Sequence, residues 1–141
     1  MNEIFSNVNW LAVIVAAAAY FVLGAIWFSK AVFANKWVQG HGINVNDPNA
    51  KKGMGQIMLF SFVAFFVICL TLAIIISKMG LTGGVMSGLK LGLVTGVGIS
   101  FMTISISHLY TKKPMSLHII DGLYHVVGQV IAAIILCIWT K

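Results

Sequence analysis

Four polar side chains that could bind a ligand or carry protons lie close together near the carboxyl end of the sequence. They are His118, Asp121, His125 and Gln129, spaced by three or four residues. On a helix, at about 100° per residue, this polar stripe falls within an arc of about 80°. Asp121 and His125 are one turn apart, so their side chains can contact each other. Because an imidazole changes its charge near neutral pH, the stripe predicts a site suited to proton exchange.

The same residues form a weak pattern for metal binding. His118 and His125 are two turns apart, about 10 Å along a helix, so one ion cannot bind both. His108, at a similar depth on the preceding predicted helix, could join Asp121 and His125. Three ligands from unlinked positions do not make a recognisable metal motif, and we predict neither a metal nor another cofactor.

The composition requires most of the chain to lie in a membrane. Hydrophobic residues make up 60% of the chain and charged residues 9%, whereas soluble domains carry roughly 25% charge. A transmembrane helix needs about 20 apolar residues. We therefore predict an all-α, polytopic membrane protein in which a single domain, residues 1–141, forms a bundle of four transmembrane helices. The predicted spans are 8–29, 57–76, 85–107 and 117–139.

The lysines predict how the bundle is oriented. Six of them lie in loops 30–52 and 108–116, whereas the opposite side carries Lys78 and Lys141. The positive-inside rule then predicts that both loops are cytoplasmic and both termini non-cytoplasmic. Anionic membrane lipids are the expected partners of these lysines. The chain has no arginine, the residue that reads DNA bases most often, and we expect no nucleic-acid partner.

Two further features fall in the third predicted span. A ridge of small residues spaced by four allows close approach of a second helix, and consists of Gly84, Gly88, Gly92, Gly96 and Ser100. This ridge fits packing within one chain or between chains; because so small a bundle has few internal contacts, we expect a homo-oligomer. Lys90 lies about two turns inside the span. Its side chain either extends to the interface or binds an anionic ligand or lipid.

The longest predicted connection, 30–52, carries local signals of its own. Asp47 followed by Pro48 is typical of an N-cap and first helical position, so the second helix is expected to begin there and extend beyond the bilayer. Aromatic residues favour the membrane interface. Those that flank the start of this connection are Trp27, Phe28, Phe33 and Trp37.

Motifs near both ends of the chain resemble those of one family. Asn9-Trp10 precedes an alanine-rich span that closes on GAIWFS at 24–29, and GLYH at 122–125 opens the last span. These motifs are similar to those of the domain of unknown function 1761 family, which comprises small prokaryotic four-helix membrane proteins. The resemblance implies the same fold, a location in the plasma (inner) membrane of a prokaryote, and no particular activity. It also singles out four residues for mutation, namely Trp10, Trp27, Tyr124 and His125.

Three functions fit these features. We predict first a non-enzymatic protein that binds a small solute or lipid-like molecule, or moves it with protons, in a cytoplasm-facing pocket around Asp121 and His125. The second is a membrane enzyme that uses His108 with these two residues as an acid–base or metal group on a hydrophobic substrate. The third is a structural or accessory subunit whose polar stripe fixes helix packing. The substrate or proton candidates are Asp121, His125, His118, His108, Gln129 and Tyr124.

Overall fold

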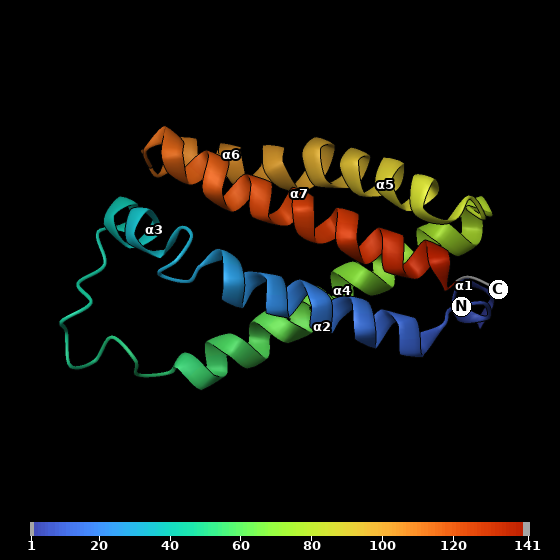
Figure 1. Cartoon of the computed structure of the whole chain (residues 1–141), viewed down its shortest axis with the longest axis horizontal. Coiled ribbons are helices and arrows are strands. Elements are labelled where there is room, and N and C mark those ends of the chain that lie inside the picture. Colours follow the sequence, from blue (N-terminus) through green and yellow to red (C-terminus); the bar gives the residue numbers. More distant parts are fainter. Residues whose placement is uncertain (1, 140–141) are drawn as a thin grey trace.

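A computed structural model describes residues 2–139, and within them it contains helices and connecting turns but no strand. Figure 1 shows the arrangement of the elements. In chain order they are α1 (Asn2–Phe5), α2 (Trp10–Trp27), α3 (Ala34–His41), α4 (Met54–Met79), α5 (Gly84–Thr95), the π-helix η1 (Gly96–Phe101), α6 (Met102–Tyr110) and α7 (Met115–Ile138).

Four helices are long and apolar enough to cross a membrane: α2, α4, α7 and the continuous helix that α5, η1 and α6 form over Gly84–Tyr110. The predicted all-α membrane architecture with four spanning helices is therefore confirmed. Figure 1 shows the two ends of the chain together at one end of the bundle, and α3 with the turn between α6 and α7 at the other. Six lysines thus belong to the α3 end, whereas Lys141 lies outside the described residues.

The second spanning helix begins later than expected. Helix α4 starts at Met54, and the prediction of a start near Pro48 is wrong. The Asp47 carboxylate instead accepts the backbone N–H of Asn49 at 2.8 Å, which closes a local turn. Gly53 then has a left-handed φ of 77°, a conformation that interrupts a helix and that glycine adopts readily.

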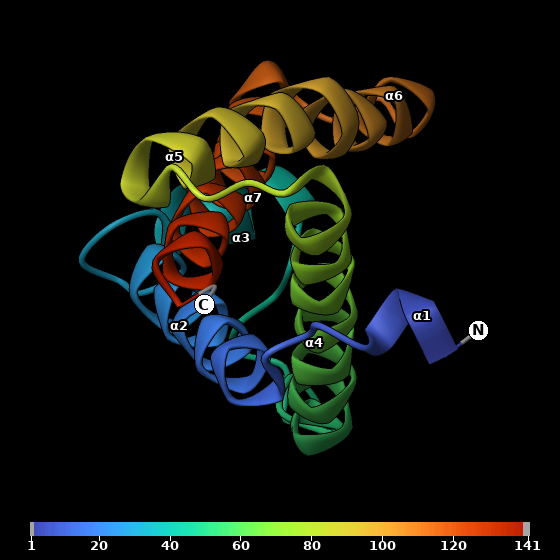
Figure 2. The ribbon, with the colours of Figure 1, turned by 90° about the vertical axis from the view of Figure 1, so that its right-hand side faces the viewer.

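Helix α7 is the centre of the bundle. It packs against α2, α4, α5, η1, α6 and α3, and the view along the bundle in Figure 2 shows α2, α4 and α5 on different sides of it. The core cluster combines small residues of α2 and α7, including Ala16, Ala17, Ala132 and Ala133, with the fully buried Tyr20. Side chains of α7 therefore meet neighbours on several sides along its length.

The ridge of small residues packs within the chain, against α7. A Cβ added at Gly88 would lie 2.5 Å from the Ile134 Cα, and one added at Gly96 would lie 2.8 Å from the Val126 Cα. Gly92 is equally close to the Val130 backbone. Gly84 instead faces open space, and Ser100 accepts a hydrogen bond from Gln129. Three of the predicted packing residues thus bring the backbones of α5–η1 and α7 into contact.

Lys90 lies on the outside of the same helix. Its side chain is exposed, and it does not line the cavity described below. Of the two roles considered for it, the position on the outer surface fits a side chain that extends to the interface.

Candidate functional site

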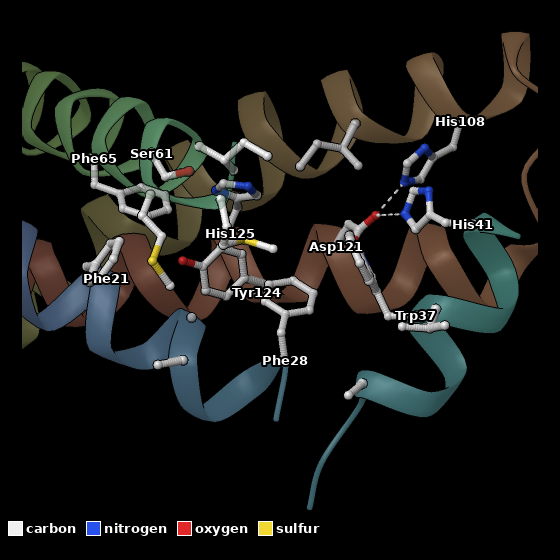
Figure 3. A pocket seen from close by; sticks show the side chains of 18 of the residues that line it. Phe21, Phe28, Trp37, His41, Ser61, Phe65, His108, Asp121, Tyr124 and His125 are labelled. Carbon is white, nitrogen blue, oxygen red and sulfur yellow. Dashed lines mark hydrogen bonds and ion pairs between the residues drawn. The ribbon is translucent and has the colours of Figure 1, made fainter. Parts of the chain in front are cut away.

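A cavity of about 760 Å³ lies at the α3 end of the bundle, between α2, α3, α4, α6 and α7. Most of its wall is aromatic or aliphatic, and Figure 3 shows its rings and polar groups. Met54, Ile57 and Met58 line it from α4 and are 42–58% exposed, so the cavity reaches the outer surface of the helix bundle there. The aromatic rings of the wall belong to Phe21, Phe28, Trp37, Phe65 and Tyr124.

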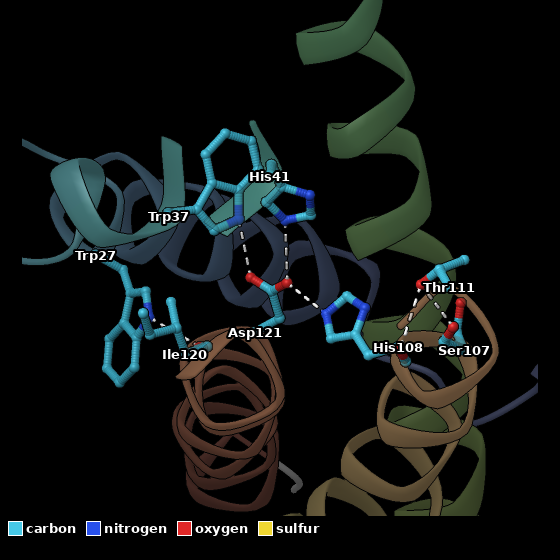
Figure 4. Close-up of polar contacts among 8 residues, drawn as sticks. All are labelled: Trp27, Trp37, His41, Ser107, His108, Thr111, Ile120 and Asp121. Carbon is cyan, nitrogen blue, oxygen red and sulfur yellow. Dashed lines mark hydrogen bonds and ion pairs between the residues drawn. The ribbon is translucent and has the colours of Figure 1, made fainter. Parts of the chain in front are cut away.

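The Asp121 carboxylate lies in this wall, where two side chains hydrogen-bond it and a third lies close to it, from α3 and α6. Its Oδ1 accepts the indole N–H of Trp37 at 3.0 Å, and its Oδ2 lies 2.7 Å from Nε2 of His108. His41 Nε2 is 3.6 Å from the same Oδ2. Figure 4 shows how these groups, here named the carboxylate cluster (Asp121, Trp37, His41 and His108), converge. An ionised carboxylate only accepts hydrogen bonds, so His108 must donate from Nε2.

His41 is the incompletely bonded member of the carboxylate cluster. Its Nε2 is buried and, among the described residues, has no hydrogen-bond partner. The ring packs against Trp37, with the ring centroids 4.6 Å apart, and α3 ends directly after it because Gly42 adopts a left-handed φ of 68°. A buried polar atom without a partner is costly. His41 lines the cavity with other atoms of its side chain, while its Nε2 faces the Asp121 carboxylate.

A second polar pair lies deeper in the bundle. The Tyr20 hydroxyl is 2.7 Å from His125 Nδ1 and donates to the His125 carbonyl oxygen at 3.2 Å. A hydroxyl has one proton and a carbonyl only accepts, so both bonds form together when Nδ1–H donates to the tyrosine oxygen. A neutral His125 then keeps Nε2 unprotonated, as an acceptor on a side chain that lines the cavity. Room for the Tyr20 ring comes from Gly128, where a Cβ would overlap it.

Asp121 and His125 share the cavity but do not pair with each other. In the part of the chain that the structure describes, no hydrogen bond or ion pair joins them: Asp121 is held by the carboxylate cluster and His125 by Tyr20. The direct contact that the spacing allows is therefore not formed. One helical turn brings two side chains to the same face, and the donors on neighbouring helices decide which partner each one takes.

The other candidates of the polar stripe have different surroundings. His118 is buried behind the cavity wall, with its ring edge-on to His108 at 5.3 Å between centroids. Gln129 is buried and bonds Ser100, which ties α7 to η1. Tyr124 lines the cavity and donates its hydroxyl to the Tyr20 carbonyl at 3.2 Å. Tyr124 therefore belongs to the site, whereas Gln129 contributes to helix packing.

Three site residues were not among the sequence candidates, namely Trp37, His41 and Tyr20. Trp37 and His41 are four residues apart on α3, which places them on one face. That spacing, followed by a glycine that ends the helix, is a signal the sequence does contain. Tyr20 offers no such signal, because it lies within a continuous apolar span.

The carboxylate cluster is not arranged as a metal centre. The described residues contain no group of three His, Cys, Asp or Glu side chains placed to hold an ion. What the arrangement offers is hydrogen bonding and proton exchange at the wall of an apolar cavity.

The two motifs quoted from the sequence meet at this wall. Gly24 approaches the Tyr124 hydroxyl so closely that a Cβ there would lie 2.8 Å from the oxygen. Trp27 donates its indole N–H to the Ile120 carbonyl at 3.1 Å. At the opposite end, Asn9 caps α2 by accepting the Ala12 N–H at 3.1 Å.

Comparisons with known proteins agree with the resemblance seen in these motifs. The profile of a family described as "Protein of unknown function (DUF1761)" matches residues 11–137. No curated protein and no solved structure matches the chain. The matched range includes the cavity wall, both polar groups and nearly all of the four spanning helices. The chain therefore belongs to the DUF1761 family, whose function is unknown.

Proposed function

We propose that the protein binds a small, largely apolar molecule in this cavity, and that the polar groups of the wall exchange protons as the molecule enters or leaves. The observation that carries the proposal is an aromatic cavity of about 760 Å³ with a hydrogen-bonded carboxylate in its wall. Ligand sites typically have volumes of about 300–1,000 Å³ and apolar walls with a few well-placed polar groups. The opening beside α4 is lined by apolar side chains, which suits a molecule that arrives from the bilayer.

Proton exchange is supported by the types of side chain at the wall. A charged residue at membrane depth is costly and commonly marks a functional pathway. Here the carboxylate of Asp121 adjoins two imidazoles, and a third, that of His125, lies one turn further along α7. Histidine side chains commonly carry protons in proteins. The net charge of the wall can therefore change while a ligand is bound.

The location of the ligand can be tested with octanol that carries a photoreactive diazirine. We expect light to attach this probe to cavity residues such as Phe65. Ala25→Phe, which adds a ring inside the cavity, should lower the yield several-fold. Ala64→Phe is the matched control, because Ala64 is exposed and does not line the cavity. Labelling spread over the lipid-facing residues of α4 and insensitive to Ala25→Phe would contradict the proposal.

We also propose that the α3 end faces the cytoplasm, because six lysines belong to it. In a protein with Cys69 and Cys137 replaced by alanine, Asn46→Cys tests this end and Thr82→Cys the opposite one. An impermeant maleimide added to intact cells should label the cysteine at 82 and leave the one at 46 unmodified. The reverse result would mean that the cavity opens toward the other side.

One observation favours a second function, acid–base catalysis on an apolar substrate. The 2.7 Å hydrogen bond between His108 and Asp121 holds an imidazole against a carboxylate beside the cavity, an arrangement used in general acid–base catalysis. Lipid extracts incubated with the protein would distinguish the two. A change in mass of a lipid component that disappears with His108→Ala supports catalysis, whereas recovery of unchanged components supports binding.

A further inference from the structure

We infer that the molecule for this cavity carries a hydroxyl group on an apolar body, and that this hydroxyl donates a hydrogen bond to Nε2 of His125. The inference rests on the proposed function, since it names the class of ligand for the same cavity. It starts from the ring nitrogen of His125 that is left over when Nδ1 pairs with the Tyr20 hydroxyl.

This nitrogen is accessible from the cavity. In the part of the chain that the structure describes, the fully buried side-chain polar atoms without a hydrogen bond are His41 Nε2 and Ser105 Oγ. His125 Nε2 forms no hydrogen bond with a described residue either, yet it is not among these buried atoms, so part of its surface is exposed. The side chain is half-buried and lines the cavity, and Figure 3 shows its ring among the groups that surround that space.

Tyr20 fixes the accessible nitrogen as an acceptor. The Tyr20 side chain is fully buried and its ring is stacked on that of Phe65, with the centroids 4.5 Å apart, so its hydroxyl is held in place. The hydroxyl proton goes to the His125 carbonyl, and Nδ1–H donates to the hydroxyl oxygen. A neutral imidazole with its proton on Nδ1 has only a lone pair at Nε2. A ligand that pairs with this atom must therefore be a donor.

Ser61 on α4 supplies the complementary group. Among the described residues its hydroxyl forms no hydrogen bond, whereas that of Thr71 on the same helix bonds a backbone carbonyl. Ser61 lies one turn before Phe65, whose ring centroid is 6.4 Å from that of His125, and Ser61 and His125 both line the cavity. The oxygen of a ligand hydroxyl can donate to Nε2 and accept from Ser61. This pair of wall groups favours a hydroxyl over a donor that has no lone pair.

The surroundings of His125 also favour a neutral ligand group over a cation. The rings of Tyr20, Phe65 and Tyr124 pack around the imidazole, with centroids 4.8–6.4 Å away. The Asp121 carboxylate is held in the carboxylate cluster instead of contacting this ring. A charge in an apolar setting is costly unless it is paired. Lipid tails, in turn, have no donor, so a hydroxyl distinguishes the ligand from the lipid chains around the bundle.

The test compares two probes, 2-(2-naphthyl)ethanol and its methyl ether, on the whole protein in lipid nanodiscs. The ether oxygen accepts hydrogen bonds but donates none. Tritiated probes and scintillation proximity give dissociation constants after subtraction of empty nanodiscs. We expect the wild type to bind the alcohol at least about tenfold more tightly than the ether, a difference of about 1.4 kcal/mol.

Two variants and one control assign the preference to the named atoms. His125→Phe removes Nε2 and should lower the affinity for the alcohol to that for the ether, while unchanged ether binding reports an intact cavity. Ser61→Ala removes a donor that both probes can use, so it should weaken both by the same few-fold factor. Thr71→Val is the matched control on α4, because Thr71 is exposed and does not line the cavity, and it should change neither affinity.

The outcomes separate this inference from the proposed function. Equal affinities for both probes in the wild type would overturn the inference and leave the cavity as an apolar binding site. Binding of neither probe would overturn both. An alcohol preference that survives His125→Phe would overturn the assignment to Nε2. If that variant does not fold, Tyr20→Phe takes its place: without the tyrosine oxygen the imidazole proton is free to move to Nε2, so an undiminished alcohol preference would overturn the inference.

Discussion

The two halves of the bundle are built on opposite principles, although α7 runs through both. In the closed half, near the chain ends, Gly88 and Gly92 bring α5 into backbone contact with Val130 and Ile134 of α7. In the cavity half, the same helix carries Asp121, Tyr124 and His125, and its neighbours are aromatic rings and α3. Small residues close one half, and large or polar residues keep space in the other.

This difference indicates where stability and function are concentrated. Close backbone contact lets helices pack in lipid, where hydrophobic exclusion contributes little between helices. Along α7 the change occurs near Gly128 and Gln129, where Tyr20 packs closely and Ser100 is bonded. The π-helix η1 faces this level of α7, and π-helical turns are frequent at functional sites. We therefore expect substitutions in the closed half to affect folding and those in the cavity half to affect binding.

The largest expected effect on the free energy of unfolding comes from a substitution that separates the helices of the closed half. Gly92→Leu would force a side chain into the Val130 backbone, which cannot yield without separating α5 from α7. Overpacking typically costs about 1–3 kcal/mol and occasionally more, and we expect about 3 kcal/mol here because the obstacle is backbone. Gly98→Leu is the control on the same continuous helix, because a Cβ at Gly98 meets nothing within 4 Å. Unfolding in mixed detergent measures both, and equal stability of the two variants would contradict the importance of the ridge.

A smaller loss is expected in the cavity half when the carboxylate is removed. Asp121→Leu would leave the Trp37 and His108 N–H groups without their acceptor, which should lower the free energy of unfolding by about 2–3 kcal/mol. Adding His108→Leu should restore part of this loss, since removing both partners of a buried hydrogen bond is less costly than removing one. Unfolding in mixed detergent measures the single and double variants as well. Strictly additive losses would show that the two residues are not energetically coupled.

The closed half could be predicted from the sequence better than the cavity half. Hydropathy and the four-residue spacing of small residues are local signals, and they identified the four helices and the ridge that holds α5 on α7. The stripe on α7 also followed from helical periodicity. The choice of partner for Asp121 did not, because it depends on the side chains that other helices bring to it.

Helix α3 was not predicted from the sequence. It is short and mostly polar, lies within a connection between spans, and so has no hydropathy signal of a spanning helix. The Asp47 carboxylate closes a turn where a helix start was expected, and α4 begins only after Gly53. Because His41 and Trp37 reach the cavity through this connection, hydropathy does not identify that half of the carboxylate cluster.

Removal of the Tyr20 hydroxyl, which lies between the two halves, should lower the free energy of unfolding moderately. Tyr20→Phe keeps the ring against Gly128 but loses the two hydrogen bonds to His125. A buried hydrogen bond contributes about 1 kcal/mol, so we expect a loss of about 1–2 kcal/mol in the free energy of unfolding. Tyr110→Phe, on a ring that is 88% exposed, is the control and should have no effect. If Tyr20→Phe leaves the free energy of unfolding unchanged, the Tyr20 hydroxyl on α2 does not hold His125.

The smallest effect is expected at Lys90, the one charge on the helix that closes the bundle. Its side chain is exposed, and the contacts of Gly88 and Gly92 on either side of it are with backbone. Lys90→Gln should therefore change the free energy of unfolding by less than about 0.5 kcal/mol. Native mass spectrometry with phosphatidylglycerol should also give unchanged lipid retention. A clear loss of bound lipid would assign Lys90 to an anion site and show that the closed half, too, binds a partner.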